Sequence, residues 1–282
     1  MSRRAERTPW LTALALPGAI WLAALVALPA LATALISLAS RGPFGEPVPP
    51  WGLHNYALLL TDPLFARVLT RSLLLGAGTT LLCALVGYPL AFHIAASRRQ
   101  TLWLLAITIP FFVNFLIRVY AWMLLLQKEG LVNAAAALLG AGPFALLPSA
   151  LAVWVATVYT FLPFFVLPVY AVVERIDWTL RDAALDLGAP PLRAFTAAVL
   201  PQTLPGLAAG AALVFVPAAG TFVIADLLGG GKITLIGNLI QLQFGAAQHW
   251  PLGAAASTVL MALALLGLAV CLRAFGAREG GR

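Results

Sequence analysis

The residue types that catalysis and metal binding require are few in this sequence and lie far apart. The three histidines, His54, His93 and His249, show no spacing typical of metal ligands. Both cysteines, Cys83 and Cys271, fall in apolar runs, so neither a disulfide nor a metal pair is indicated. No Ser/His/Asp set or pair of carboxylates lies at the end of an apolar run. We therefore expect no catalytic residue, no metal site and no cofactor on this chain, which argues against an enzyme.

A glycine-rich stretch, Gly229-Gly230-Gly231-Lys232, contains part of the pattern of a phosphate-binding loop. Such a loop needs Gly-x4-Gly-Lys-Ser/Thr ahead of a helix, so that backbone N–H groups surround the phosphates. Here Lys232 is followed by Ile233. The stretch is therefore predicted to be a flexible turn and not a nucleotide site.

Charged residues concentrate in one stretch, 174–201, which is predicted to fold as a helix, a sharp bend and a second helix. Asp177 is a plausible N-cap for the first helix, and Gly188 can adopt the left-handed conformation that ends it. Pro190 or Pro191 fits the first turn of the second helix, where a missing N–H costs nothing.

Each of these two helices carries an apolar stripe. In the first helix the stripe has the spacing i, i+3, i+4, i+7 and comprises Leu180, Ala183, Ala184 and Leu187. In the second it comprises Leu192, Phe195 and Val199. A short helix with alanines at its centre buries little area but allows close approach, which suits a knob in the groove of a partner. An amphipathic loop packed on its own bundle explains the stripe equally well.

The composition excludes a water-soluble protein. Of the 282 residues 62% are hydrophobic and 10% are charged, and the mean hydropathy is +0.96. A soluble domain usually carries about a quarter charged residues, so the solvent of this chain must be the lipid bilayer. The net charge of +7 comes mostly from arginines at the ends of apolar runs, without the basic stripe that would indicate nucleic acid.

Long runs without Asp, Glu, Lys or Arg occupy 8–40, 130–173, 194–225 and 233–272. Each is long enough to cross the hydrocarbon core, which takes about 20 apolar residues. They lack the alternation of barrel strands and are therefore predicted to be helices. We expect an all-α polytopic membrane bundle that forms a single domain over 1–282. Its six spans are predicted at about 11–39, 68–96, 101–126, 146–173, 203–228 and 251–274.

Positive charges favour one side of this bundle. The larger group comprises Arg3, Arg4, Arg7, Arg98, Arg99, Arg175, Arg181, Arg193, Arg273, Arg278 and Arg282. The smaller group comprises Arg41, Arg67, Arg71, Arg118, Lys128 and Lys232. Because cytoplasmic loops carry the excess of cations, both termini and the loop 174–202 are predicted to be cytoplasmic, in the inner membrane of a bacterial cell. On the outer side we expect a short interfacial helix near 51–60 and an apolar segment, 131–139, lying against the bundle.

The charged loop resembles the EAA loop of ABC importer permeases, whose pattern is Glu-Ala-Ala-x3-Gly-x9-Ile-x-Leu-Pro. The matching residues are Asp182, Ala183, Ala184, Gly188, Leu200 and Pro201. Asp182 stands where the family has Glu and keeps the charge, whereas Ala198 replaces Ile and shortens an apolar contact. The resemblance implies that these residues, with Leu187 of the apolar stripe, form a coupling helix that docks on an ATPase.

Further motifs are similar to those of spermidine/putrescine importer permeases. They are Pro17-Gly-Ala19, Arg118-Val-Tyr-Ala-Trp122, Glu129-Gly-Leu-Val-Asn133, Asp226-Leu-Leu-Gly-Gly230, Ile236-Gly-Asn-Leu-Ile240 and Trp250-Pro-Leu-Gly-Ala-Ala255. The resemblance implies a type I ABC importer permease fold and a polyamine or related organic amine as solute. That branch also contains permeases for opines, other organic cations and some anions.

The resemblance also implies a set of partners. They are an ABC ATPase dimer that binds ATP and Mg²⁺, a second homologous permease, and a periplasmic or lipid-anchored solute-binding protein. The alternative from another class is a stand-alone secondary transporter. Such a protein usually has coupling acids within its spans or internal repeats, and neither is seen in this sequence.

Asp226 is the one acidic residue near membrane depth outside the predicted loops, which makes it a functional candidate by default. Its carboxylate would stabilise a polyamine, and aromatic faces would add cation–π attraction. The aromatic candidates for such a path are Tyr120, Trp122, Tyr159 and Phe222. Local capping or pairing of Asp226, for example with Lys232, is an equally good explanation. Arg118 argues against a purely cation-friendly path.

Overall fold

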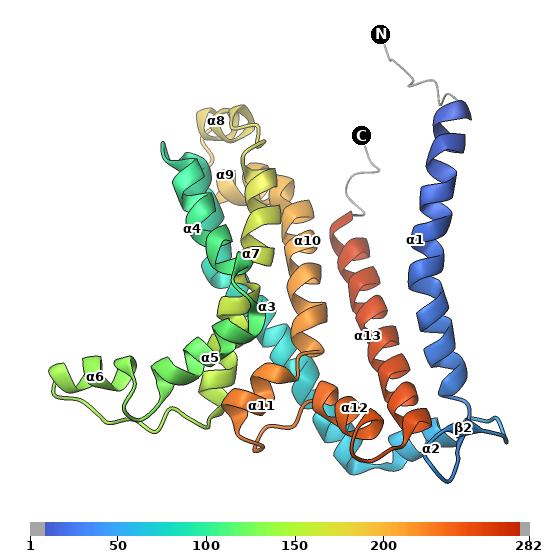
Figure 1. The fold of residues 1–282 in the computed structure, drawn as a ribbon. Coiled ribbons are helices and arrows are strands. Elements are labelled where there is room, and N and C mark those ends of the chain that lie inside the picture. Colours follow the sequence, from blue (N-terminus) through green and yellow to red (C-terminus); the bar gives the residue numbers. More distant parts are fainter. Residues whose placement is uncertain (1–8, 277–282) are drawn as a thin grey trace. The chain divides into compact units, whose positions relative to one another are not determined.

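Helices dominate the computed structural model, in which we describe the backbone over residues 9–276 and the side chains over 16–270 and at Arg273. The predicted cytoplasmic charges Arg3, Arg4, Arg7, Arg278 and Arg282 lie outside the described residues, as does the side chain of Cys271. The elements (Figure 1) are α1 (Pro9–Ile36), β1 (Ser40–Arg41), β2 (Pro47–Val48), α2 (His54–Thr61), α3 (Pro63–Ala96), α4 (Gln100–Phe112), α5 (Phe115–Leu126), α6 (Leu131–Leu138), α7 (Ala150–Val173), α8 (Thr179–Asp186), α9 (Pro191–Ala194), a π-helical turn (Phe195–Val199), α10 (Leu200–Ala219), α11 (Val223–Gly229), α12 (Ile236–Phe244) and α13 (Trp250–Gly276).

The chain divides into two compact units. The smaller unit contains the residues up to Asp62 together with Ile240–Val259, and the larger contains Pro63–Leu239 together with the residues from Leu260 onward. Whether the chain acts as the single domain predicted over 1–282 stays a prediction.

The smaller unit ties α2 to the end of α1. Asn55 is buried near the start of α2, and its amide donates to the carbonyl oxygens of Ser37 and Ala39 at 2.8 Å each. The hydroxyls of Ser37 and Tyr56 share a hydrogen bond of 2.6 Å. The strands β1 and β2 form a short antiparallel ribbon between the two helices. A helix therefore lies close to the predicted range 51–60, and its position at the membrane surface stays a prediction.

The larger unit is built on α3, α7 and α10, which lie side by side (Figure 1). Phe165, Val166 and Val169 of α7 are buried in its core together with Ile94 of α3 and Val214 of α10. Because the hydrophobic effect between helices is weak in lipid, close packing of side chains must supply much of the free energy of helix–helix association. The three helices form the scaffold that carries the charged loop at one end.

Two glycines four positions apart bring α10 against α7. A Cβ placed on Gly206 would lie 3.1 Å from the carbonyl oxygen of Pro168, and one placed on Gly210 would lie 3.1 Å from that of Phe165. Small residues at this spacing let two helix backbones approach closely within a membrane. The contact fixes the two helices between which the charged loop runs.

The third span departs from the prediction of one helix over 101–126. It is broken between α4 and α5, and the helical segment after the break is bent by 96° from α4. Pro110 lacks an N–H for the last turn of α4, and the side chain of Asn114 accepts a hydrogen bond from the N–H of Leu116 at 2.9 Å, which starts a new helix. With 13 residues, α4 is about 20 Å long and too short to cross the bilayer alone.

The fifth span also differs from its predicted range, 203–228. The helix runs without interruption over Pro191–Ala219, so the second half of the charged loop and the span are one rod. A π-helical turn joins the two parts, in which the N–H of Leu200 bonds to the carbonyl oxygen of Phe195. At the other end, the poor helix former Gly220 ends α10, and α11 begins separately at Val223.

Candidate functional site

The first helix of the charged loop, α8, begins at Thr179. The carboxylate of Asp177 accepts hydrogen bonds from the N–H of Thr179 at 3.0 Å and from its hydroxyl at 2.6 Å, so the predicted cap lies one residue outside the helix boundary at Trp178. Arg181 lies over the Trp178 ring, 5.9 Å from its centroid. Its ion pair with Asp182 is 4.0 Å long and exposed, and such pairs contribute little to stability.

Three of the four residues of the first apolar stripe, Leu180, Ala183 and Leu187, do not pack on the bundle. Leu187 is 89% exposed and Leu180 is 44% exposed, and no residue of α8 is buried. Ala184 and Leu185 are half-buried and form the inner side of the helix. Of the two explanations left open by the sequence, packing of the stripe on its own bundle is therefore not supported, and docking on a partner stays a prediction.

The bend after α8 has the predicted chemistry. Gly188 has φ +82°, the left-handed conformation that ends many helices. The N–H of Gly188 bonds to the carbonyl oxygen of Leu185 at 2.9 Å, and that of Ala189 to Ala184 at 3.0 Å. Pro191 then occupies the first position of α9.

The second predicted stripe needs a correction at Leu192. Val199 is fully buried and Phe195 is half-buried, with its ring 6.0 Å from that of Phe92 in α3. Leu192, however, is 75% exposed, and Ala194 is buried in its place. The reason is that α9 is only one turn long, and contact with α3 begins after it, at Phe195 in the π-helical turn. Leu192 therefore lies ahead of that contact.

A glutamine that sequence reasoning missed holds both ends of the loop. The side-chain amide of Gln202 donates to the carbonyl oxygens of Ala198 at 2.7 Å and of Asp177 at 3.4 Å, and its oxygen accepts from the N–H of Asp177 at 3.1 Å. This clamp joins the start of α8 to the start of α10. The one sequence signal for a role of Gln202 is its position directly after Leu200 and Pro201, two residues of the matched loop pattern.

The matching residues of the EAA-like pattern therefore lie in two environments. On the loop surface, exposed apart from the half-buried Ala184, lie Asp182, Ala183, Ala184, Leu187 and Gly188. Half-buried at the root of the loop, where α10 begins, lie Leu200 and Pro201. An exposed helix, α8, that is hydrogen-bonded through Gln202 to the start of α10 can transmit a force to α10 without catalysing a reaction.

At the opposite end of the larger unit, Asp226 is exposed and pairs locally. Its carboxylate accepts a hydrogen bond from the side-chain amide of Asn238, which also donates to the carbonyl oxygen of Phe222 at 3.2 Å. Among the described residues no ion pair joins Asp226 to Lys232. The predicted local pairing therefore exists, but its partner is Asn238.

The aromatic candidates lie in separate places. The rings of Trp122 and Tyr159 meet edge to face with centroids 5.4 Å apart. Phe222 directly precedes α11, and Asn238 links it to Asp226 by donating hydrogen bonds to the carbonyl oxygen of Phe222 and to the carboxylate of Asp226. Tyr120 is 46% exposed, and no ring contact within the described chain joins it to the others. A path lined by all of them stays a prediction.

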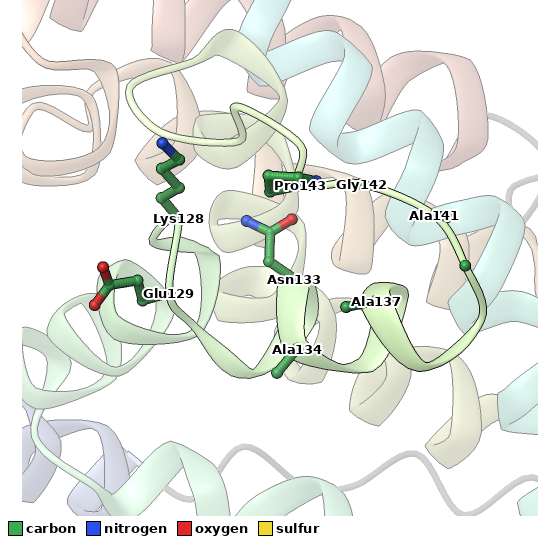
Figure 2. Close-up of a pocket in the computed structure, with 9 residues that line it drawn as sticks. Lys128, Glu129, Asn133, Ala134, Ala137, Ala141, Gly142 and Pro143 are labelled. Carbon is green, nitrogen blue, oxygen red and sulfur yellow. The ribbon is translucent and has the colours of Figure 1, made fainter.

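The segment around α6 (Figure 2) borders an open depression of about 440 Å³. Asn133 rises from α6 toward Pro143, donates to the carbonyl oxygens of Gln127 at 3.2 Å and Phe144 at 3.0 Å, and accepts from the N–H of Phe144 at 2.8 Å. These bonds hold the loop, so Asn133 has a structural role. The prediction that 131–139 lies against the bundle is wrong, because Leu138 is 90% exposed and hydrogen bonds, not apolar packing, fix the segment.

Comparisons with known proteins assign the chain to a family. No family model matches it. It is 38% identical over 250 residues to the spermidine/putrescine transport system permease protein PotB of Haemophilus influenzae, which covers 86% of this chain and 87% of the relative. Against PotB of Escherichia coli K12 the identity is 39% over 253 residues, covering 87% and 92%. The chain belongs to the spermidine/putrescine transport system permease family.

Other relatives and solved structures agree with this assignment. The inner membrane ABC transporter permease protein YdcU of Escherichia coli K12 is 32% identical over 226 residues, covering 74% of this chain and 72% of the relative. A chain of a bacterial ABC transporter that imports alginate has the same fold, with a TM-score of 0.66 at 18% identity and 98% coverage of both chains. The predicted all-α membrane bundle of an ABC importer permease is therefore confirmed, and the chain is a transport subunit.

Proposed function

We propose that the chain is one permease of an inner-membrane importer that moves a polyamine, or a related organic amine, inward by alternating access. A separate ATPase dimer supplies the energy, a second homologous permease completes the pathway, and a solute-binding protein docks outside. The observation that carries the proposal is the exposed apolar face of α8 on a root clamped by Gln202. Leu180, Ala183 and Leu187 are all exposed on this face, and apolar side chains gathered in one place are typical of a protein–protein contact.

The mechanism follows from the continuity of the rod Pro191–Ala219. When ATP closes the ATPase dimer, α8 moves with the surface on which it is docked. Because the Gln202 clamp ties α8 to the root of α10, and Gly206 and Gly210 tie α10 to α7, the displacement moves α7 and α10 as a rigid pair. Rigid-body motion of this kind opens one side of a pathway and closes the other.

The orientation of the larger unit supports a cytoplasmic loop. In Figure 1, α8 and the start of α4 lie at one end of α7, whereas α6 and α11 lie at the other. Arg98 and Arg99 precede α4 and Arg175 precedes α8, so these cations gather at the end that carries α8. By the positive-inside rule this end faces the cytoplasm, and we infer that both termini do as well.

A co-purification and uptake experiment tests the proposal. The tagged chain, extracted from its native membrane, is expected to bring down an ATPase and a second permease. Proteoliposomes containing this complex, with the solute-binding protein added outside, are expected to take up spermidine only when ATP is present on the side of the ATPase. Uptake by the chain alone, or uptake without ATP, would overturn the proposal in favour of a secondary transporter.

For the solute, the names of the PotB relatives favour a polyamine, and Asp226 offers the carboxylate that a polycation requires. We expect Asp226→Asn to raise the spermidine concentration for half-maximal uptake about tenfold, because a hydrogen-bonded ionic contact is lost. Asparagine keeps a hydrogen-bonding group toward Asn238, so the complex should assemble normally. Glu129→Gln, which removes an exposed acid at the same end, is the matched control. Unchanged spermidine uptake by Asp226→Asn would remove Asp226 from the path.

A further inference from the structure

Arg118 is a buried cation without a counter-charge among the described residues. Its side chain is 9% exposed, and its Nε has no hydrogen-bond partner. Its guanidinium lies 5.6 Å from the ring centroid of Phe111 and 6.0 Å from that of Phe115. No carboxylate of the described residues lies within ion-pair distance of it. Two aromatic faces attract a cation, but they offer no acceptor for its N–H groups.

The residue sits at the break in the third span. Arg118 belongs to the first turn of α5, and its backbone N–H bonds to the carbonyl oxygen of Asn114 at 3.2 Å. The side-chain oxygen of Asn114 is occupied by the N–H of Leu116. The backbone N–H of Arg118 and the side-chain oxygen of Asn114 are therefore used by the helix start itself, and Nε of Arg118 is left without a partner.

The surface around the break is apolar and is not covered by the part of the chain that the structure describes. Phe112 is 81% exposed, Ile117 is 61% exposed and Ile109 is 59% exposed. A partner that covers these side chains would remove the remaining solvent from Arg118. A desolvated guanidinium without an acceptor is strongly unfavourable, whereas one paired with a carboxylate can form two parallel hydrogen bonds.

We propose that Arg118 pairs with an acidic side chain of the second permease, and that the exposed surface of Ile109, Phe112 and Ile117 is part of the contact between the two permeases. The inference rests on the proposed function. In that assembly the ATPase and the binding protein lie outside the membrane, and a polyamine carries no carboxylate. The second permease is then the chain that can place an acid at the depth of the α4–α5 break.

A carbodiimide experiment on the purified complex tests the pair directly. In Arg118→Lys a membrane-permeable carbodiimide should join the lysine Nζ to the facing carboxylate as an amide, while the reagent takes up the released water and becomes a urea. We expect an adduct between the two permeases, with one cross-linked Asp or Glu found by mass spectrometry. Wild type and Arg118→Gln, which offer no amine at this position, should give none. An adduct with an acid of the same chain, or no adduct, would overturn the proposal.

A second measurement uses a variant without the charge. Arg118→Gln should release the second permease from the detergent-solubilised complex roughly thirtyfold faster, because truncating one member of a buried charge pair acts on dissociation. Arg71→Gln, at an exposed arginine of α3, should dissociate at the wild-type rate. Normal assembly of Arg118→Gln combined with lost uptake would overturn the pair and point to a carboxylate on the solute. Failure of the wild-type chain to bind any second permease would instead contradict the proposed function.

Discussion

Leu187→Asp is expected to abolish ATP-driven uptake while leaving the membrane fold intact. Leu187 is 89% exposed at the end of α8 and makes no core contact, so its replacement costs the free permease little. In the docked complex, however, the aspartate would place an unpaired charge in an apolar groove, which is far less favourable than the leucine it replaces. We expect uptake of spermidine by proteoliposomes, and recovery of the ATPase with the tagged chain, to fall at least about tenfold.

Leu138→Asp is the matched control for this variant. Leu138 is 90% exposed, lies in α6 at the opposite end of the larger unit, and receives the same substitution. It should bind the ATPase as the wild type does. If Leu187→Asp retained full uptake, or if both variants lost the ATPase equally, α8 would not be the coupling element.

Gly210→Leu is expected to have the largest effect on stability. Even a Cβ at Gly210 would lie 3.1 Å from the Cδ2 and from the carbonyl oxygen of Phe165, and Phe165 is itself 1% exposed in the core. A leucine would force α10 away from α7, and overpacking of this kind costs about 1–3 kcal/mol, with more where backbone must move. The measurement is thermal unfolding of the purified chain in detergent, where we expect a lower midpoint and poor recovery.

Ala209→Leu controls for the added side chain on α10. Ala209 is exposed on the same helix, so a leucine there meets no packed neighbour. The midpoint of thermal unfolding should stay unchanged. Gly210→Ala should lie between the two, since it adds the Cβ alone. Wild-type stability of Gly210→Leu would contradict the close α7–α10 contact.

The break at Val113 and Asn114 shows why some elements were missed. The segment 101–126 carries no charged residue apart from Arg118. Its summed hydropathy indicates that it is long and apolar enough to span, but not whether the helix changes direction. Pro110 and Asn114 are the local signals for the break, yet proline also occurs within uninterrupted helices such as α7, at Pro163 and Pro168. Only the packing of each helix decides whether a proline bends it slightly or ends it.

The contact of Gly206 and Gly210 was available from the sequence as a pair of small residues four positions apart. For Gln202 the sequence offered only its position after Leu200 and Pro201. Its hydrogen bonds to Asp177 could not be foreseen, because Asp177 lies on the far side of a bend whose closure cannot be judged from spacing. Likewise, the local partner of Asp226 is Asn238, twelve residues away, and not the nearer Lys232. Hydrogen-bond partners across a turn depend on the path of the chain between them.

The amino-acid sequence alone determined that this is a helical membrane protein, where its charged loop lies, and that the loop bends at Gly188. These properties follow from hydropathy, charge and backbone preference, which act over a few neighbouring residues. The tertiary structure alone decided that the apolar face of α8 stays exposed, that the third span breaks, and that Arg118 is buried without an acid from the described residues beside it. Burial and pairing arise from residues far apart in the chain, so they exist only once the helices are packed.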